Sequence, residues 1–431
     1  MTTTSLDGML LGTASAALQI EGNMPRTNWH DWAAAGHVAD GTGPEVTTDH
    51  WRRWREDNAL MQELGLQIAR ISIEWARVEP VEGRIDDAAL ARYREEIQDL
   101  RERGIRPLVT LHHFGNPGWL EDRGGFGPES SVAVFLRFVD VVLDAVGDLV
   151  DDWVTINEPN VYATLGYVFG EGPPGVVSWT ELRRVLRHLA VAHCRAYRMI
   201  HSRLDAPGRD VRVTFAHHVR DFQPMNPKNP VHRMFTWVDE ELFHRAVERA
   251  FFSGIFDSFV GTPSLEWRVE PGRYVDVIAV NYYSRTAVTG LKDGVFPDVE
   301  VTDLGWEIYP EGIVEVSRTL HERYGGLPIW ITENGCADNG DTDSLERFRC
   351  RYVLAHLEAL ASSGLPVERY YHWCFVDNWE WSEGMIPRFG IVHLDRKTLA
   401  RTPKPSARMF RDLIRAGAIT PEIRERYEEP R

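Results

Sequence analysis

IARISIEW occupies residues 68–75, ALARYREEIQDLRERG residues 89–104 and PLVTLHHF residues 107–114. The first and third of these segments are nearly continuous apolar runs, as is typical of parallel strands that are covered on both faces. In the middle segment, apolar residues from Leu90 to Leu100 recur at helical spacing. The three segments therefore predict a strand, a helix and a second strand that is parallel to the first.

The same alternation continues along the whole chain. Further candidate helices cover residues 54–65, 182–204 and 344–364. Further candidate strands cover residues 10–16, 153–158, 211–218, 275–283, 328–335 and 369–375. Eight strand–helix units predict an α/β fold, namely a (β/α)8 TIM barrel formed by a single domain, with its longest insertions after the fourth and fifth strands. We assign residues 1–418 to this barrel and residues 419–431 to an acidic, solvated C-terminal tail, because no change in composition marks a second domain.

The composition is that of a globular protein. The chain has 431 residues, with 48 Lys and Arg against 64 Asp and Glu, which gives a net charge of −16. A hydrophobic content of 43% with 26% charged residues excludes a disordered or fibrous chain. The negative charge argues against nucleic acid as a partner. The sequence contains no apolar run of about 20 residues, so we expect no membrane span.

The cysteines and the N-terminus bear on the cellular compartment. The cysteines are widely separated and form no CxxC motif, which argues against a disulfide scaffold and against a cysteine zinc site. They are Cys194, Cys336, Cys350 and Cys374. The N-terminus is apolar but lacks the basic start of a secretion signal, and Asp7 lies where that start would be. We therefore expect a cytoplasmic protein.

Active sites of such barrels lie at the C-terminal ends of the strands, so polar residues at those ends are the candidates. They are Gln19, Glu21, Arg70, His113, Asn157, Glu158, Asn281, Tyr283, Glu333, Asn334 and Trp373. This set contains no phosphate-binding loop. His217 and His218 are adjacent, but no acidic or cysteine partner lies at ligand spacing. We therefore expect neither a metal nor a cofactor.

Two carboxylates suggest a chemistry. Glu158 ends the fourth predicted strand in TINEP, and Glu333 ends the seventh in ITENG. These strands face each other across the mouth of a barrel. Two carboxyl groups about 5–5.5 Å apart can cleave a glycosidic bond, one as nucleophile and the other as proton donor. The alternative is that each glutamate merely pairs with a basic residue at a strand end.

Several motifs in order resemble those of glycoside hydrolase family 1, the retaining β-glucosidase and β-galactosidase group. Besides TINEP and ITENG they are ALQIEG, EDNALMQELG, NYYS, GWEIYPEG and DNWEWSEGMIPRFG. The resemblance runs from about Gly12 to about Phe410. It implies hydrolysis of small β-O-glycosides or oligosaccharides through a covalent glycosyl-enzyme. Glu333 would be the nucleophile and Glu158 the general acid, then the base.

The resemblance also implies supporting roles. Arg70 and Tyr283 would keep Glu333 ionised, and repulsion from Glu333 would raise the pKa of Glu158. Asn157 would hold the sugar 2-hydroxyl, with Asn281 beside it. The residues that match the family's sugar-binding positions are Gln19, His113, Trp373, Glu380, Trp381 and Phe389. Glu380 would repel a phosphate, which predicts an unphosphorylated glucose, galactose or fucose.

Some positions depart from the family pattern. Phe114 replaces the usual Trp, Phe126 ends the usual GGW motif, and Asn160 replaces an aromatic residue after the acid. Because of these changes the resemblance does not predict the aglycone-binding residues, among which Trp306 is the candidate platform. One alternative is a deglycosylase or transglycosylase dedicated to one natural-product pathway. Another is an inactive sugar-binding barrel, although such proteins usually lack one of the two carboxylates. The oligomeric state is open.

Overall fold

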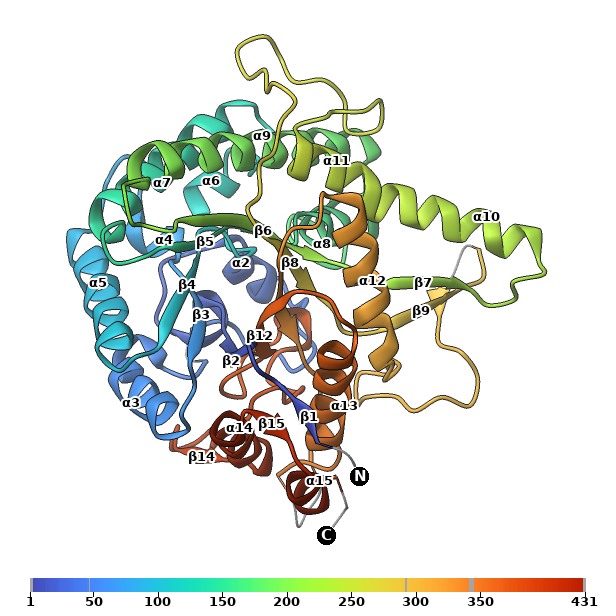
Figure 1. Ribbon diagram of the computed structural model, residues 1–431. Coiled ribbons are helices and arrows are strands. Elements are labelled where there is room, and N and C mark those ends of the chain that lie inside the picture. Colours follow the sequence, from blue (N-terminus) through green and yellow to red (C-terminus); the bar gives the residue numbers. More distant parts are fainter. Residues whose placement is uncertain (1–2, 46, 291–292, 341–344, 429–431) are drawn as a thin grey trace.

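In the computed structural model, eight parallel strands close into one barrel in the order β11-β12-β2-β3-β4-β5-β6-β8 (Figure 1). The structure describes residues 3–45, 47–290, 293–340 and 345–428. The barrel strands are β2 (Leu10–Ala14), β3 (Ile68–Ser72), β4 (Arg106–Thr110), β5 (Asp152–Asn157), β6 (Arg212–His218), β8 (Ile278–Asn281), β11 (Ile329–Asn334) and β12 (Val367–Trp373). Each lies within a predicted strand or within a few residues of it. The predicted (β/α)8 barrel is confirmed.

Helices surround the barrel, and most of the longer ones cover its outer face, whereas α10 (Pro230–Asp239) projects away from it (Figure 1). The longer ones are α3 (His50–Glu63), α5 (Asp87–Glu102), α7 (Ser130–Val146), α9 (Trp179–Leu204), α10 (Pro230–Asp239), α11 (Ala246–Ser253), α12 (Pro310–Arg323), α13 (Arg349–Ser362) and α14 (Pro405–Ala416). The shorter ones are α1 (Ala17–Ile20), α2 (Asn28–Ala34), α4 (Trp75–Val78), α6 (Gly118–Glu121), α8 (Pro159–Thr164), α15 (Pro421–Tyr427), the π-helical turns η1 (Leu165–Phe169) and η2 (Glu240–Arg245), and the 3₁₀ turn η3 (Trp381–Glu383). None of the described helices is long and apolar enough to cross a membrane.

Side chains alternate between the two faces of each strand, and this alternation delivers polar groups to the barrel mouth. On β3, Ile68 packs into the barrel interior, whereas Ala69 and Ile71 join the apolar layer beneath the helices. Arg70 lies two residues beyond Ile68 and therefore on the inner face. Neighbouring strands approach closely here, because a Cβ added to Gly12 would lie 1.8 Å from the carbonyl oxygen of Ile68.

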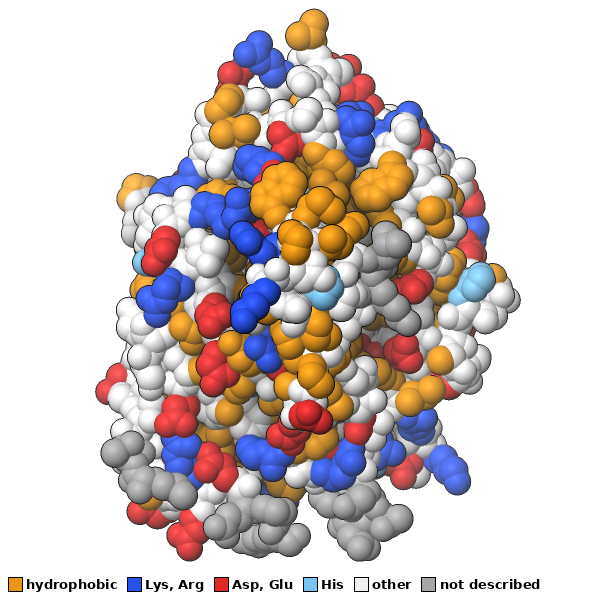
Figure 2. Space-filling view, turned by 90° about the vertical axis from the view of Figure 1, so that its right-hand side faces the viewer, with side chains coloured by type: hydrophobic (Ala, Val, Ile, Leu, Met, Phe, Trp, Pro, Cys, Tyr) orange, Lys and Arg blue, Asp and Glu red, His pale blue; other side chains and the backbone are white. Residues whose placement is uncertain are grey.

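The intervals after β6 and β8 contain a smaller sheet in the order β10-β9-β7. Its strands are β7 (Asp221–Pro224), β9 (Arg285–Val288) and β10 (Asp293–Gly294), and α10 projects beside it (Figure 1). On α10, Val231, Met234 and Trp237 are exposed. Hydrophobic side chains gather on the side of the molecule from which this helix projects (Figure 2).

The two ends of the chain lie close together (Figure 1). β1 (Thr4–Ser5) pairs antiparallel with β15 (Ala418–Ile419), and β13 (Val392–Leu394) pairs with β14 (Arg401–Pro403). Beyond β15, helix α15 buries Ile423 and Arg424. Residues 429–431 of the expected tail lie outside the described residues.

Candidate active site

A cavity of about 640 Å³ opens at the C-terminal ends of the barrel strands. The predicted site residues that line it are Glu158, Glu333, Tyr283, His113, Trp373, Glu380, Trp381, Phe389 and Trp306. The others, Gln19, Arg70, Asn157 and Asn281, are fully buried, and each forms a hydrogen bond with one of the lining residues. All thirteen residues therefore gather at one place, although their assigned roles stay predictions.

The backbone turns sharply at Glu158. This residue follows β5 and precedes α8, where Pro159 fixes the first helical position. Glu158 has φ 43° and ψ 59°, in the left-handed region that non-glycine residues rarely occupy. Its amide nitrogen donates to the carbonyl oxygen of Ala216 on the neighbouring strand at 2.7 Å. Such conformations cluster at functional sites, where the surrounding structure holds them in place.

Two donors bind one carboxylate oxygen of Glu158. Asn281 Nδ2 donates to Oε1 at 2.7 Å, and His218 Nδ1 lies 3.0 Å from the same atom. Arg220 Nε donates to His218 Nε2 at 3.3 Å. Since Nε2 accepts this hydrogen bond, the imidazole proton is on Nδ1 and points at Glu158.

Glu333 is bound by a permanent cation and a phenol. Arg70 forms an ion pair with Oε1, and the hydroxyl of Tyr283 donates to Oε2 at 2.7 Å. Arg70 also donates to Asn157 Oδ1 at 2.6 Å, and Asn281 Nδ2 lies 3.1 Å from that same oxygen. A continuous hydrogen-bond network thus connects Glu333 with the asparagine that binds the other carboxylate.

The electrostatic balance is the reverse of the expectation at both carboxylates: the pKa of Glu333 is raised, although Arg70 and Tyr283 bind it, and that of Glu158 is lowered. Burial raises the pKa of Glu333, Arg70 opposes this, and the charge of Glu158 adds to it, so that the pKa is about 7. Burial also acts to raise the pKa of Glu158, but His218 and Asn281 outweigh it and hold this pKa below its usual value. The expected rise at Glu158 is therefore not found, because the sequence argument did not include His218. Between the two pKa values the pair carries one proton, and the directions of the shifts place it on Glu333.

The opposite side of the cavity carries a third carboxylate. Gln19 Nε2 and Trp373 Nε1 each donate to Glu380, both at 3.1 Å. Burial raises the pKa of Glu380 to about 8, although these two donors oppose the rise. Next to it, His113 Nε2 accepts from Asn157, and the ring stacks on Trp373. Among the described residues, Gln19 Oε1 and His113 Nδ1 have no hydrogen-bond partner although both are buried.

Aromatic rings form the rest of the wall. Trp306 lies 5.5 Å from Tyr283 and 6.1 Å from Phe389, measured between ring centroids. On the other side, Trp381 lies 4.7 Å from Trp29 and 5.1 Å from Phe114. An apolar cavity with a few converging polar groups is the usual form of a small-molecule site.

Two sequence candidates serve the scaffold. Glu21 pairs with Arg77 beneath the cavity. Asn334 donates to the carbonyl oxygen of Tyr282 and to the hydroxyl of Tyr352. Sequence reasoning considered His218 only as a metal ligand and missed its contact with Glu158, although His218 ends β6 and the rule of polar residues at strand ends includes it.

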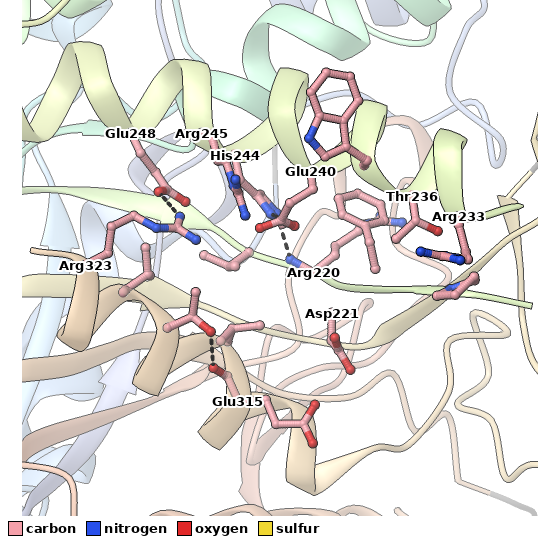
Figure 3. Close-up of a pocket in the computed structure, with 17 residues that line it drawn as sticks. Arg220, Asp221, Arg233, Thr236, Glu240, His244, Arg245, Glu248, Glu315 and Arg323 are labelled. Carbon is pink, nitrogen blue, oxygen red and sulfur yellow. Dashed lines mark hydrogen bonds and ion pairs between the residues drawn. The ribbon is translucent and has the colours of Figure 1, made fainter. Parts of the chain in front are cut away.

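A second cavity, of about 500 Å³, lies outside the barrel between β7, α10, η2 and α12 (Figure 3). Its charged side chains include the ion pair of Arg323 with Glu248, and the backbone nitrogen of Arg220 donates to His244 there. Within the described residues, no group of His, Cys, Asp or Glu side chains could hold a metal ion.

Comparisons with known proteins agree with this geometry. Residues 1–418 match the model of "Glycosyl hydrolase family 1". The chain is 30% identical to beta-glucosidase A of Thermotoga maritima, over 96% of this chain and 98% of that protein. It is 32% identical to a beta-galactosidase of Saccharolobus solfataricus, over 93% and 91%. A solved structure of a family 1 β-glucosidase from Thermotoga maritima superimposes with a TM-score of 0.88 at 28% identity, covering 97% of this chain and all of that one.

Proposed function

This chain belongs to glycosyl hydrolase family 1, and on that premise we propose that Glu333 and Glu158 cleave β-O-glycosides by double displacement. The observation that carries the proposal is that both carboxyl groups line one cavity. Each has its own hydrogen-bond donors, and a network through Arg70, Asn157 and Asn281 connects them. The enzyme is an O-glycosyl hydrolase of the β-glucosidase and β-galactosidase type. The residue roles are the proposed part.

In the first half-reaction, Glu333 attacks the anomeric carbon while Glu158 protonates the leaving oxygen. The reactive form has the single proton of the pair on Glu158 and the charge on Glu333, so the proton that the pKa directions place on Glu333 has to move to Glu158 before the attack. Arg70 supports this form, because it is a permanent cation bound to Glu333, whereas Glu158 faces the neutral donors His218 and Asn281. Tyr283 stabilises the charge of the nucleophile with a second donor.

In the second half-reaction, Glu158 acts as a base. Once Glu333 is an ester, its charge no longer repels that of Glu158. His218 and Asn281 then favour the ionised carboxylate, which removes a proton from the attacking water. His218 and Asn281 therefore disfavour the protonated Glu158 of the first half-reaction and favour the ionised Glu158 of the second. Attack from the face opposite to Glu333 inverts the anomeric carbon again, so the configuration is retained overall.

The sugar would lie between the catalytic pair and Glu380. Glu380, Gln19 and His113 offer a carboxylate and two unpartnered polar atoms to hydroxyl groups. Trp373 and Trp381 offer indole surfaces to the apolar face of the ring. Phe389 closes the site with an apolar wall and Trp306 provides an aglycone platform. A third carboxylate at this side disfavours a phosphorylated sugar, so we assign an unphosphorylated glucose, galactose or fucose.

We also propose a cytoplasmic location. Its support is that all the cysteines of the chain are free and buried, as expected for thiols kept in a reducing compartment.

The test is hydrolysis of a panel of aryl β-glucosides, galactosides, fucosides and mannosides, with the first product followed by NMR. We expect release of the β-anomer before mutarotation. Release of the α-anomer would contradict double displacement, and turnover of none of the panel would support the sugar-binding alternative. Sugar transferred to an added alcohol, at the expense of free sugar, would favour the transglycosylase alternative.

A further inference from the structure

Arginines buried in this protein are paired with carboxylates. The buried ones are Arg70, Arg77, Arg349, Arg369 and Arg424, and each forms an ion pair. Arg220 is half-buried, and within the described residues it forms no ion pair. Its Nε donates to His218, and its backbone nitrogen donates to His244. The terminal nitrogens Nη1 and Nη2 have no hydrogen bond to any described residue.

Arg220 lies where three cavities meet. It lines the active-site cavity, the outer cavity of Figure 3, and a third space of about 180 Å³ that Tyr283 and Trp306 also line. Through His218 it stands directly behind Glu158, the residue that faces the leaving oxygen. The sugar-binding carboxylate Glu380 belongs to a different wall. Arg220 is therefore placed on the aglycone side of the scissile bond.

A half-buried guanidinium that lines a cavity and forms no ion pair presents its positive charge to that cavity, where it favours an anionic ligand. Burial lowers the pKa of Arg220, and the negative charges of Asp293 and Glu158 partly offset this. Neither forms an ion pair with it. The planar fork of two free Nη groups matches the two oxygens of a carboxylate.

We propose that Arg220 selects aglycones that carry a carboxylate, which binds the two Nη groups while the sugar occupies the catalytic pair. This inference rests on the proposed function and deepens it, because it assigns the chemical class of the leaving group. Arg220 is thus a specificity-determining residue of the aglycone site. The aromatic face of Trp306, which lines the same two spaces, would support an aromatic or otherwise apolar body of that aglycone.

The experiment compares meta- and para-carboxyphenyl β-glucosides with the uncharged carbamoylphenyl isomers. For each enzyme form, the ratio of kcat/KM for the charged substrate to that for the neutral one is measured. The ratio for the native enzyme is then divided by the ratio for Arg220→Gln, and this quotient cancels the intrinsic reactivity of the leaving groups. If a charge-assisted contact is lost in the variant, the quotient should be about ten or more. Arg220→Lys keeps the charge without the fork and should retain part of the preference.

Arg233→Gln is the matched control, because Arg233 lines only the outer cavity and is exposed. It should leave the ratio unchanged. A quotient within about twofold of one for both isomers would overturn the inference. Failure to hydrolyse the neutral glucosides as well would instead refute the proposed function.

If Arg220→Gln does not fold, salt provides the second measurement. Raising the ionic strength from about 10 mM to about 500 mM should lower the charged-to-neutral ratio of the native enzyme. A ratio that does not respond to salt would overturn the inference.

Discussion

Replacing Glu158 by glutamine removes the proton donor and keeps the shape of the side chain. The loss should depend on the leaving group, because a basic leaving oxygen needs a proton and a weakly basic one does not. For phenyl β-glucoside we expect kcat/KM to fall by the full contribution of a general acid, about 10²–10⁴-fold. For 2,4-dinitrophenyl β-glucoside the loss should stay below about tenfold.

The structure supports the large loss of kcat/KM for phenyl β-glucoside, because no other described group at this side of the cavity can take over the proton transfer. Burial lowers the pKa of His218 and holds that of His113 well below its usual value, so both rings are neutral at pH 7. Glu380 is bound by Gln19 and Trp373 on another wall. Glu158 is therefore the one donor on its side of the described cavity.

The assay is kcat/KM across a series of aryl glucosides of increasing leaving-group pKa. This parameter reports the steps up to the first irreversible one, so a slow second half-reaction does not distort it. Glu171→Gln is the control, because Glu171 is an exposed carboxylate on the rim of the same cavity. An equal loss on the phenyl and dinitrophenyl substrates would refute the assignment of Glu158 as the acid.

Three further predictions concern charged groups. Above about pH 8, where Glu380 is ionised, Glu380→Gln should lower kcat/KM for glucosides about 10- to 100-fold, as for the loss of a charge-assisted hydrogen bond of about 1.5–3 kcal/mol, and an unchanged value would exclude sugar contact. His218→Ala removes a donor that lowers the pKa of Glu158, so the alkaline limb of the kcat/KM profile should move to higher pH; a shift to lower pH would contradict the network. Burial lowers the pKa of His50, but Glu96 and Asp57 outweigh this and raise the pKa to about 9. The ionised His50 therefore adds to the free energy of unfolding below pH 6.5, its pKa in the unfolded chain, and this contribution should be lost as the pH rises through 9. The loss, measured by urea melts, should be about 3 kcal/mol and absent in His50→Gln; equal losses would refute it.

The barrel could be predicted because each of its strands is buried on both faces. The predicted strand 211–218 corresponds to β6, and the predicted strand 328–335 corresponds to β11. The sheet of β7, β9 and β10 could not be predicted, because its strands have two to four residues and show no alternation. Strands this short are fixed by their pairing across an insertion, which is a tertiary effect.

The site was partly predictable for a similar reason. The meeting of Arg70 with Glu333 follows from two strand ends that face one barrel interior. The balance of charge at Glu158 depends on His218, which lies 60 positions away and contributes through one ring nitrogen. The place of His218 at the end of β6 could be read from the sequence, but its pairing with Glu158 comes from the curvature of the closed sheet and could not. The roles of the individual residues stay predictions.

The most direct measurement is covalent labelling with 2,4-dinitrophenyl 2-deoxy-2-fluoro-β-glucoside. The fluorine slows both half-reactions, while the activated leaving group still permits the first, so the glycosyl-enzyme accumulates. Mass spectrometry should find one fluoroglucosyl unit per chain, attached to Glu333. A label on any other residue, or no label on an enzyme that hydrolyses the parent glucoside, would contradict the account.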